Sequence, residues 1–291
     1  MKKNTAKTGV LLVILGAFLW STSAPLVRWL NVDSFTVVAL RAFFACMALL
    51  PFLRLSKIVW NKTLICFLFC YLALGIGIIV GLNNTSTPIA IGMQFTACIW
   101  LFLLARPSRN ALRLGNTWPL LVLIAGVGIS MLSRADDVTL FGNLVALSTS
   151  FSFAGVTYFA KKMSSTNPAG LSCISNLFVA LVVFVFIQQP SYSLLSGISG
   201  LEWGVLVFLG AFQIGLAFSC YYAGLLYIEA KTAAMFAPLE MILAPLWVAL
   251  FLRQYPDMIG LLGFVLVIVG VFGEALLSAR RADRETKDTA Q

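Results

Sequence analysis

The sequence contains no histidine among its 291 residues, and only 11% of its residues are charged. Without histidine, the chain lacks the usual zinc ligand and the side chain that most often moves protons near neutral pH. It also lacks a phosphate-binding loop of the GxxxxGK[ST] type, which argues against ATP hydrolysis by this chain alone. We therefore expect no enzymatic activity, no metal and no cofactor.

The scarcity of charge also excludes a soluble domain, in which about 25% of residues are usually charged. Hydrophobic residues make up 60% of the chain, more than a soluble core of this length can bury. The net charge of +9 does not predict nucleic-acid binding, because the basic residues form short clusters between apolar runs. The six cysteines lie inside those runs, so a disulfide framework is not expected.

Apolar segments of about 20 residues, the length that crosses a bilayer core, follow one another with short loops between them. We predict ten, at 9–30, 34–53, 63–83, 86–105, 117–133, 141–160, 169–189, 203–227, 231–252 and 258–277. The first could instead belong to a signal peptide with STSAP as its cleavage region, but nine spans would spoil the charge pattern described next. Residues 279–291 are polar and charged, which predicts a disordered tail.

The basic residues predict the orientation of these spans. With the N-terminus inside, sixteen of the twenty basic residues fall in cytoplasmic segments, three fall in outer segments, and Arg41 falls inside a span. Cytoplasmic loops of membrane proteins carry such an excess of Lys and Arg. We therefore expect both termini in the cytoplasm of a cell whose inner membrane holds the protein.

The two halves of the chain resemble each other. LGAFLWSTS at 15–23 corresponds to LSTSFSFAG at 147–155, each in the first span of a set of five. Because five is odd, the two sets must cross the membrane in opposite directions. The sequence thus predicts an all-α integral membrane fold of two inverted repeats, at 1–135 and 138–278, an architecture typical of alternating-access transporters.

Several segments, in order, resemble the EamA-type members of the drug/metabolite transporter superfamily. They are LGAFLWSTSAPLVRWL in the first span, the Leu40-Arg41 pair in the second, GNLVALSTSFSFAGVTYFAKKM in the sixth, and the run from Tyr221 to Val271 across the eighth to tenth. The chain departs from the family pattern after the fourth and ninth spans, where neither repeat keeps the family's Leu-Gly-Glu. The resemblance implies ten helices and a central cavity bounded by spans 1, 3, 4, 6, 8 and 9.

Two charged residues lie deep inside predicted spans. Glu240 stands between Pro238 and Pro245, and a charge in mid-bilayer costs at least ~2.5–3.5 kcal/mol. We interpret Glu240 as a cavity-lining carboxylate that binds an amine or takes a proton during transport; the alternative is a structural acid that pins helix packing. Arg41 would bind a substrate carboxylate or phosphate, or would form a structural ion pair, for example with Glu240.

Other polar and aromatic residues complete the candidate site. Gln94 in the fourth span stands near the position that Glu240 has in the ninth, so it would donate to a substrate or bond a neighbouring helix. Trp20, Trp100, Tyr221 and Tyr222 would form the wall of a pocket for a flat or apolar solute, although membrane aromatics often only pack or face lipid.

The resemblance implies a secondary transporter or facilitator for small organic solutes, amino acids or related metabolites, with export as the expected direction. Coupling to protons would run through Glu240. The alternative is a membrane-embedded enzyme or lipid-handling protein, which would need a cluster of polar groups near one membrane face.

Overall fold

The computed structural model of the chain describes residues 2–85, 87–104, 114–130, 132, 139–188, 195–252 and 258–288, and in these ranges all regular elements are helices. The first half contains α1 (Lys2–Trp20), α2 (Ser23–Trp29), α3 (Ser34–Leu49), η1 (Leu50–Phe52), η2 (Leu55–Lys57), α4 (Lys62–Asn84), α5 (Thr87–Phe95), α6 (Ala97–Leu104) and α7 (Leu114–Ser130). The second half contains α8 (Leu140–Lys162), α9 (Pro168–Val182), η3 (Val183–Ile187), α11 (Gly200–Phe208), η4 (Leu209–Leu216), α12 (Ala217–Leu225), α13 (Ala230–Phe236), α14 (Leu239–Leu252) and α15 (Met258–Asp288).

Six helical segments are long and apolar enough to cross a membrane. They are Thr5–Trp29, Ser34–Phe52, Lys62–Asn84, Leu140–Lys162, Pro168–Ile187 and Gly200–Leu225. Three shorter apolar helices follow the same pattern, at Ala90–Leu104, Asn116–Ile129 and Met258–Gly273. The outside of the bundle exposes large apolar side chains such as Leu11, Phe69 and Phe186, which suits contact with lipid.

Local sequence explains where several helices begin. The Asp33 side chain accepts hydrogen bonds from the backbone N–H groups of Phe35 and Thr36 at the start of α3. Asn61 and Thr139 cap α4 and α8 in the same way. These short polar side chains satisfy N–H groups that have no partner within the helix.

Three helical rods are interrupted near their middle. Between α1 and α2, the Ser21 and Thr22 hydroxyls donate to backbone carbonyls three residues earlier, which competes with the helical ladder. Thr96 separates α5 from α6, and its hydroxyl donates to the Met93 carbonyl in the same manner. Pro238 lies in the break between α13 and α14, because proline cannot donate the next helical hydrogen bond.

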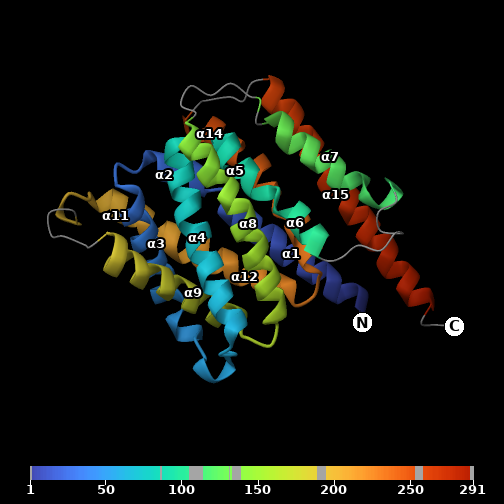
Figure 1. The fold of residues 1–291 in the computed structure, drawn as a ribbon, viewed down its shortest axis with the longest axis horizontal. Helices are drawn as coiled ribbons and strands as arrows, with labels where there is room; N and C mark the ends of the chain where they lie inside the picture. Colours follow the sequence, from blue (N-terminus) through green and yellow to red (C-terminus); the bar gives the residue numbers. More distant parts are fainter. Residues whose placement is uncertain are drawn as a thin grey trace.

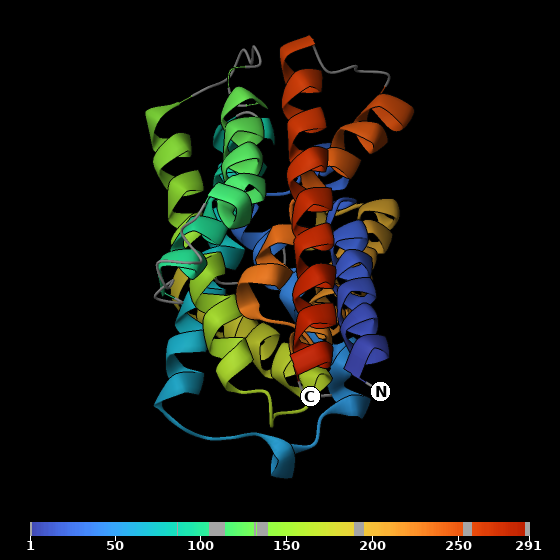
Figure 2. The same ribbon diagram turned by 90° about the vertical axis from the view of Figure 1, so that its right-hand side faces the viewer.

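The helices form one bundle in which elements far apart in sequence lie side by side (Figure 1). Close pairs are α7 with α15, α4 with α8, α1 with α12, and α3 with both α9 and η4. Figure 2 shows α15 running beside α7, with the start of α1 and the end of α15 at the same end of the bundle. η3 and η4 are π-helical, a geometry that often occurs at functional sites.

The C-terminal segment differs from the disordered tail that the sequence predicts. α15 continues through Asp288, so residues 279–288 are helical, while residues 289–291 lie outside the described part. The run SARRADRETKD contains two Ala, three Arg, one Lys and one Glu, which have high helix propensity and extend the preceding apolar helix.

Candidate functional site

Arg41 lies in the interior of the bundle, in the middle of α3. Its side chain is 4% exposed, and its Nη1 atom has no hydrogen-bond partner. The π-helical segment η4 packs directly on this part of α3: a Cβ placed on Gly210 would lie 2.6 Å from the Arg41 carbonyl oxygen. Glycine at position 210 therefore allows the two backbones to approach at the level of the buried charge.

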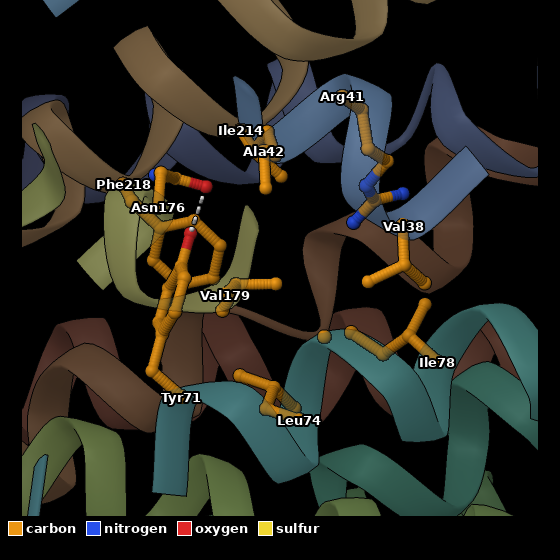
Figure 3. A pocket seen from close by; sticks show the side chains of 11 residues that line it. Val38, Arg41, Ala42, Tyr71, Leu74, Ile78, Asn176, Val179, Ile214 and Phe218 are labelled. Carbon is orange, nitrogen blue, oxygen red and sulfur yellow. Dashed lines mark hydrogen bonds between the residues drawn. The ribbon is translucent and has the colours of Figure 1, made fainter. Parts of the chain in front are cut away.

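A small cavity lies beside Arg41 (Figure 3). Its volume is about 20 Å³, room for about one water molecule, so in this conformation it is too small for an organic solute. Tyr71 and Asn176 are its other polar residues, and the Tyr71 hydroxyl donates to Asn176 Oδ1 over 3.1 Å. The Asn176 amide donates in turn to the Ser172 carbonyl over 2.8 Å, which fixes its orientation. The cavity is lined from both halves of the chain, by α3 and α4 and by α9, η4 and α12.

An aromatic cluster fills the core next to this cavity. The Trp20 ring lies 4.7 Å from that of Phe218 and 5.1 Å from that of Tyr221. Phe218 also contacts the Tyr71 ring, at 5.0 Å, and so connects Trp20 to the cavity wall. The Tyr221 hydroxyl lies 2.9 Å from Thr157 Oγ1, while the hydroxyl of the adjacent Tyr222 has no hydrogen-bond partner.

Glu240 is also buried, at 7% exposure, in the first turn of α14 directly after the break at Pro238. It interacts electrostatically with Arg41. Among the described residues, however, no carboxylate forms an ion pair with Arg41 within 4.0 Å. The two ionisable side chains are therefore both buried in the core, without a direct ion pair between them.

The structure thus brings only some of the predicted site residues together. Arg41 lines the cavity, and Trp20, Tyr221 and Tyr222 belong to the adjoining aromatic cluster. Gln94 is buried near the end of α5, next to the break at Thr96, and does not line this cavity.

Tyr71 and Asn176 were absent from the sequence-based site. Asn176 could have been found by the criterion that singled out Arg41, because it is a polar residue in the middle of an apolar run. Gln213 in the run LGAFQIGL fits that criterion too: it is buried, and its Oε1 atom has no partner. Tyr71 carries no such signal, since tyrosine is common in membrane helices.

Comparisons with known proteins relate the chain to a transporter family. Residues 140–274 match the profile of the EamA-like transporter family. The chain is 25% identical over 234 residues to a biotin transporter of Salmonella typhimurium (strain LT2), covering 76% of this chain and 77% of the relative. A biotin transporter of Salmonella typhi matches with the same identity and coverage.

The fold is also found in a crystal structure of another protein. That structure superposes with a TM-score of 0.73 at 16% identity, covering 95% of this chain and 99% of the other. Several helices are able to span a membrane, so with the family match the protein is a multi-pass membrane protein. Residues 140–274 form an EamA-like transporter family domain, in agreement with the predicted relation to the drug/metabolite transporter superfamily.

Proposed function

We propose that this protein is a secondary transporter or facilitator that moves small organic solutes across the cytoplasmic membrane by alternating access. Ten membrane-spanning segments would form two inverted five-helix repeats, at residues 1–135 and 138–278, with both termini in the cytoplasm. The observation that carries the proposal is the buried Arg41 cavity, which is lined by helices from both halves of the chain. Transporters built from repeats bind their solutes at such an interface between repeats.

The contact between α7 and α15 supports the inverted repeat. A Cβ on Gly126 would meet the Gly263 oxygen and the Val267 nitrogen, and a Cβ on Gly270 would meet the Pro119 oxygen and the Leu123 nitrogen. The second contact repeats the first with the roles of the two helices exchanged: Gly126 corresponds to Gly270, Gly263 to Pro119 and Val267 to Leu123. The two members of each pair are the same number of residues apart in the chain. From the first contact to the second, the residue number falls along α7 and rises along α15, so the helices are antiparallel. A two-fold axis in the membrane plane would produce this exchange.

Two further helix pairs fit the same exchange. α4 packs on α8 and α12 packs on α1, which are the third helix of one repeat against the first helix of the other in each case. The breaks in the fourth and ninth rods, α5–α6 and α13–α14, also occupy equivalent places.

Reconstitution into proteoliposomes tests the function. We expect counterflow of a labelled solute from a panel of amino acids, related metabolites and biotin, the last because of the relatives named above. Export, the expected direction, would be read from the preferred orientation of uptake in vesicles of known sidedness. Counterflow no faster than in protein-free liposomes for every solute would contradict the proposal.

Glu240→Gln tests the coupling of transport to protons. The amide keeps the size of the side chain but can neither carry a negative charge nor take up a proton. We expect transport by this variant to lose its response to an imposed pH gradient while solute exchange continues. Uptake measured at several gradients decides the point, and an unchanged pH response would exclude proton coupling through Glu240.

A further inference from the structure

We propose that the cavity beside Arg41 binds the carboxylate of an organic monoanion whose remaining surface is largely apolar. This names the class of substrate and rests on the proposed transport function. Three features of the described residues carry it: an unpartnered cation, apolar walls, and a nearby acid that limits the charge of the ligand.

The first feature is the guanidinium itself. Arg41 is almost completely buried, yet its Nη1 atom has no hydrogen-bond partner and no described carboxylate lies within ion-pair distance. A buried donor without a partner is costly, and a buried charge more so. A carboxylate satisfies a guanidinium best, because two parallel N–H···O bonds match the geometry of both groups.

The second feature is the chemistry of the walls. Apart from Arg41, the cavity is lined mainly by aliphatic side chains from α3, α4 and α9, such as Val38, Leu74 and Val179. The polar atoms of Tyr71 and Asn176 already bond each other. Arg41 is thus the group that would fix the head of a ligand, while the apolar walls would accept its body.

The third feature is Glu240, which interacts electrostatically with Arg41 from α14. A dianion such as a phosphate monoester would bring two negative charges toward one guanidinium, and the neighbouring Glu240 side chain cannot supply a second positive charge. Coulomb interactions are strong in such a poorly screened interior, so the single cation favours a ligand of single negative charge.

The test compares matched pairs of ligands that differ only in this charge. Binding of aromatic and aliphatic monocarboxylates, with indole-3-acetate as the first probe, is measured against the corresponding primary amides on the purified full chain. We expect the wild type to prefer each acid that binds, and Arg41→Gln to lose roughly ten- to hundredfold in affinity for the acids but little for the amides. Arg41→Lys keeps the positive charge but cannot form two parallel hydrogen bonds with a carboxylate. It should therefore restore part of the preference for acids that Arg41→Gln loses.

Arg28→Gln is the matched control, because Arg28 is an exposed arginine at the end of α2; it should leave the preference unchanged. If Arg41→Gln does not fold, Arg41→Lys carries the test, with a severalfold weaker preference for acids expected. The proposal is overturned if no acid binds up to millimolar concentration, or if the wild type binds acids and amides alike. It is also overturned if the folded Arg41 variant keeps the wild-type preference. Counterflow of uncharged solutes in these cases would leave the transport function standing.

A second inference rests on two hydrogen bonds that join corresponding helices in the two halves. Trp100 Nε1 in α6 donates to Ser150 Oγ in α8 over 2.8 Å, and Trp247 Nε1 in α14 donates to Ser21 Oγ between α1 and α2 over 2.9 Å. Both serines are fully buried. Each bond therefore links the second part of an interrupted rod to the first helix of the other half.

The two bonds lie toward opposite ends of the bundle. Lys231 at the start of α13 has its Nζ atom 6.0 Å from the centre of the Phe102 ring in α6. This contact lies at the end of the bundle where the chain starts. α14 instead packs on both α1 and α2, and α2 lies toward the other end. Each tryptophan also borders an apolar groove on the side of the bundle, of about 500 Å³ at Trp100 and about 840 Å³ at Trp247.

We infer that these Trp–Ser bonds are the two gates of the transport cycle, both closed in this conformation. In this conformation the Arg41 cavity, at about 20 Å³, is closed to an organic solute. Opening one bond at a time would admit solute from one side only, as alternating access requires.

Thiol labelling tests the gates. Ala42, which lines the Arg41 cavity, is changed to cysteine, and a membrane-impermeant methanethiosulfonate is added from either side of oriented proteoliposomes. Loss of a neutral hydrogen bond should raise labelling roughly two- to tenfold. In Trp100→Phe the increase is expected from the side of the membrane where the chain starts, and in Trp247→Phe from the opposite side. Mass spectrometry distinguishes the introduced thiol from the native cysteines.

Trp60→Phe, at an exposed tryptophan before α4, is the control and should change labelling from neither side. A merely structural bond would raise labelling from both sides or lower the yield of folded protein without a preferred side. Either tryptophan variant leaving labelling unchanged, or both raising it from the same side, overturns the inference.

Discussion

Gly126→Leu is expected to prevent α7 and α15 from packing and to remove most of the folded protein. Even a Cβ at this position would lie 2.7 Å from the Val267 nitrogen and 2.8 Å from the Gly263 oxygen. Backbone atoms cannot move aside as the end of a flexible side chain can, so the whole helix must shift. In membranes, helices associate through such close contacts between small residues. We expect a loss of at least ~3 kcal/mol, the upper end of ordinary overpacking.

The same helix offers a matched control. A Cβ on Gly128 would meet nothing within 4 Å, so Gly128→Leu should leave the yield and melting temperature close to those of the wild type. Size-exclusion chromatography of both variants in detergent, followed by thermal unfolding, measures the difference. Equal stability of the two variants would show that the α7–α15 contact does not hold the fold together.

Trp20→Ala is expected to destabilise the protein by about 3–5 kcal/mol, the usual cost of emptying a buried aromatic site. Trp20 is 3% exposed, and its ring contacts those of Phe153, Phe218 and Tyr221. It therefore joins α1 to α8 and α12 at the level of the Arg41 cavity. Removing the ring leaves a space that these three neighbours, each packed against other rings, cannot close without losing contacts of their own.

Trp29→Ala serves as the comparison, because Trp29 is 47% exposed at the end of α2. We expect this variant to lose much less stability, as judged by the midpoint of thermal or denaturant-induced unfolding in the same detergent. If both tryptophan variants unfold at the same midpoint, the aromatic cluster is not the stabilising core that the contacts indicate.

The fold class follows from the sequence because it depends on composition and span length alone. Scarce charge and repeated apolar runs predicted the all-helical membrane protein, and six described helices are long and apolar enough to cross a membrane, with three shorter apolar helices beside them. The count of ten spans stays a prediction. The tail is the exception: its polar composition predicted disorder, but its local helix propensity extends α15 to Asp288. The resemblance to EamA-type transporters is confirmed for residues 140–274, where the motifs were longest.

Individual charges could also be located in the sequence, because a charged residue within an apolar run must be buried or paired. Arg41 and Glu240 were recognised on this ground, and both are buried. Their roles in binding and coupling remain predictions. Their positions along the chain do not define the direction in which each side chain points or the distance between the two side chains.

The sequence by itself determined the class of protein, the approximate spans and the two residues whose burial needs a reason. Only the tertiary structure decided that Arg41 lines one cavity with Tyr71 and Asn176, that Gln94 lies away from this cavity, and that Trp100 and Trp247 bond to serines of the opposite half. The physical reason is that hydrophobicity is a property of each segment. Contacts between helices depend instead on how each helix is rotated about its axis and how deep it lies in the membrane. Close glycine contacts, such as that of Gly210 on α3, fix this rotation and depth only when all helices are packed.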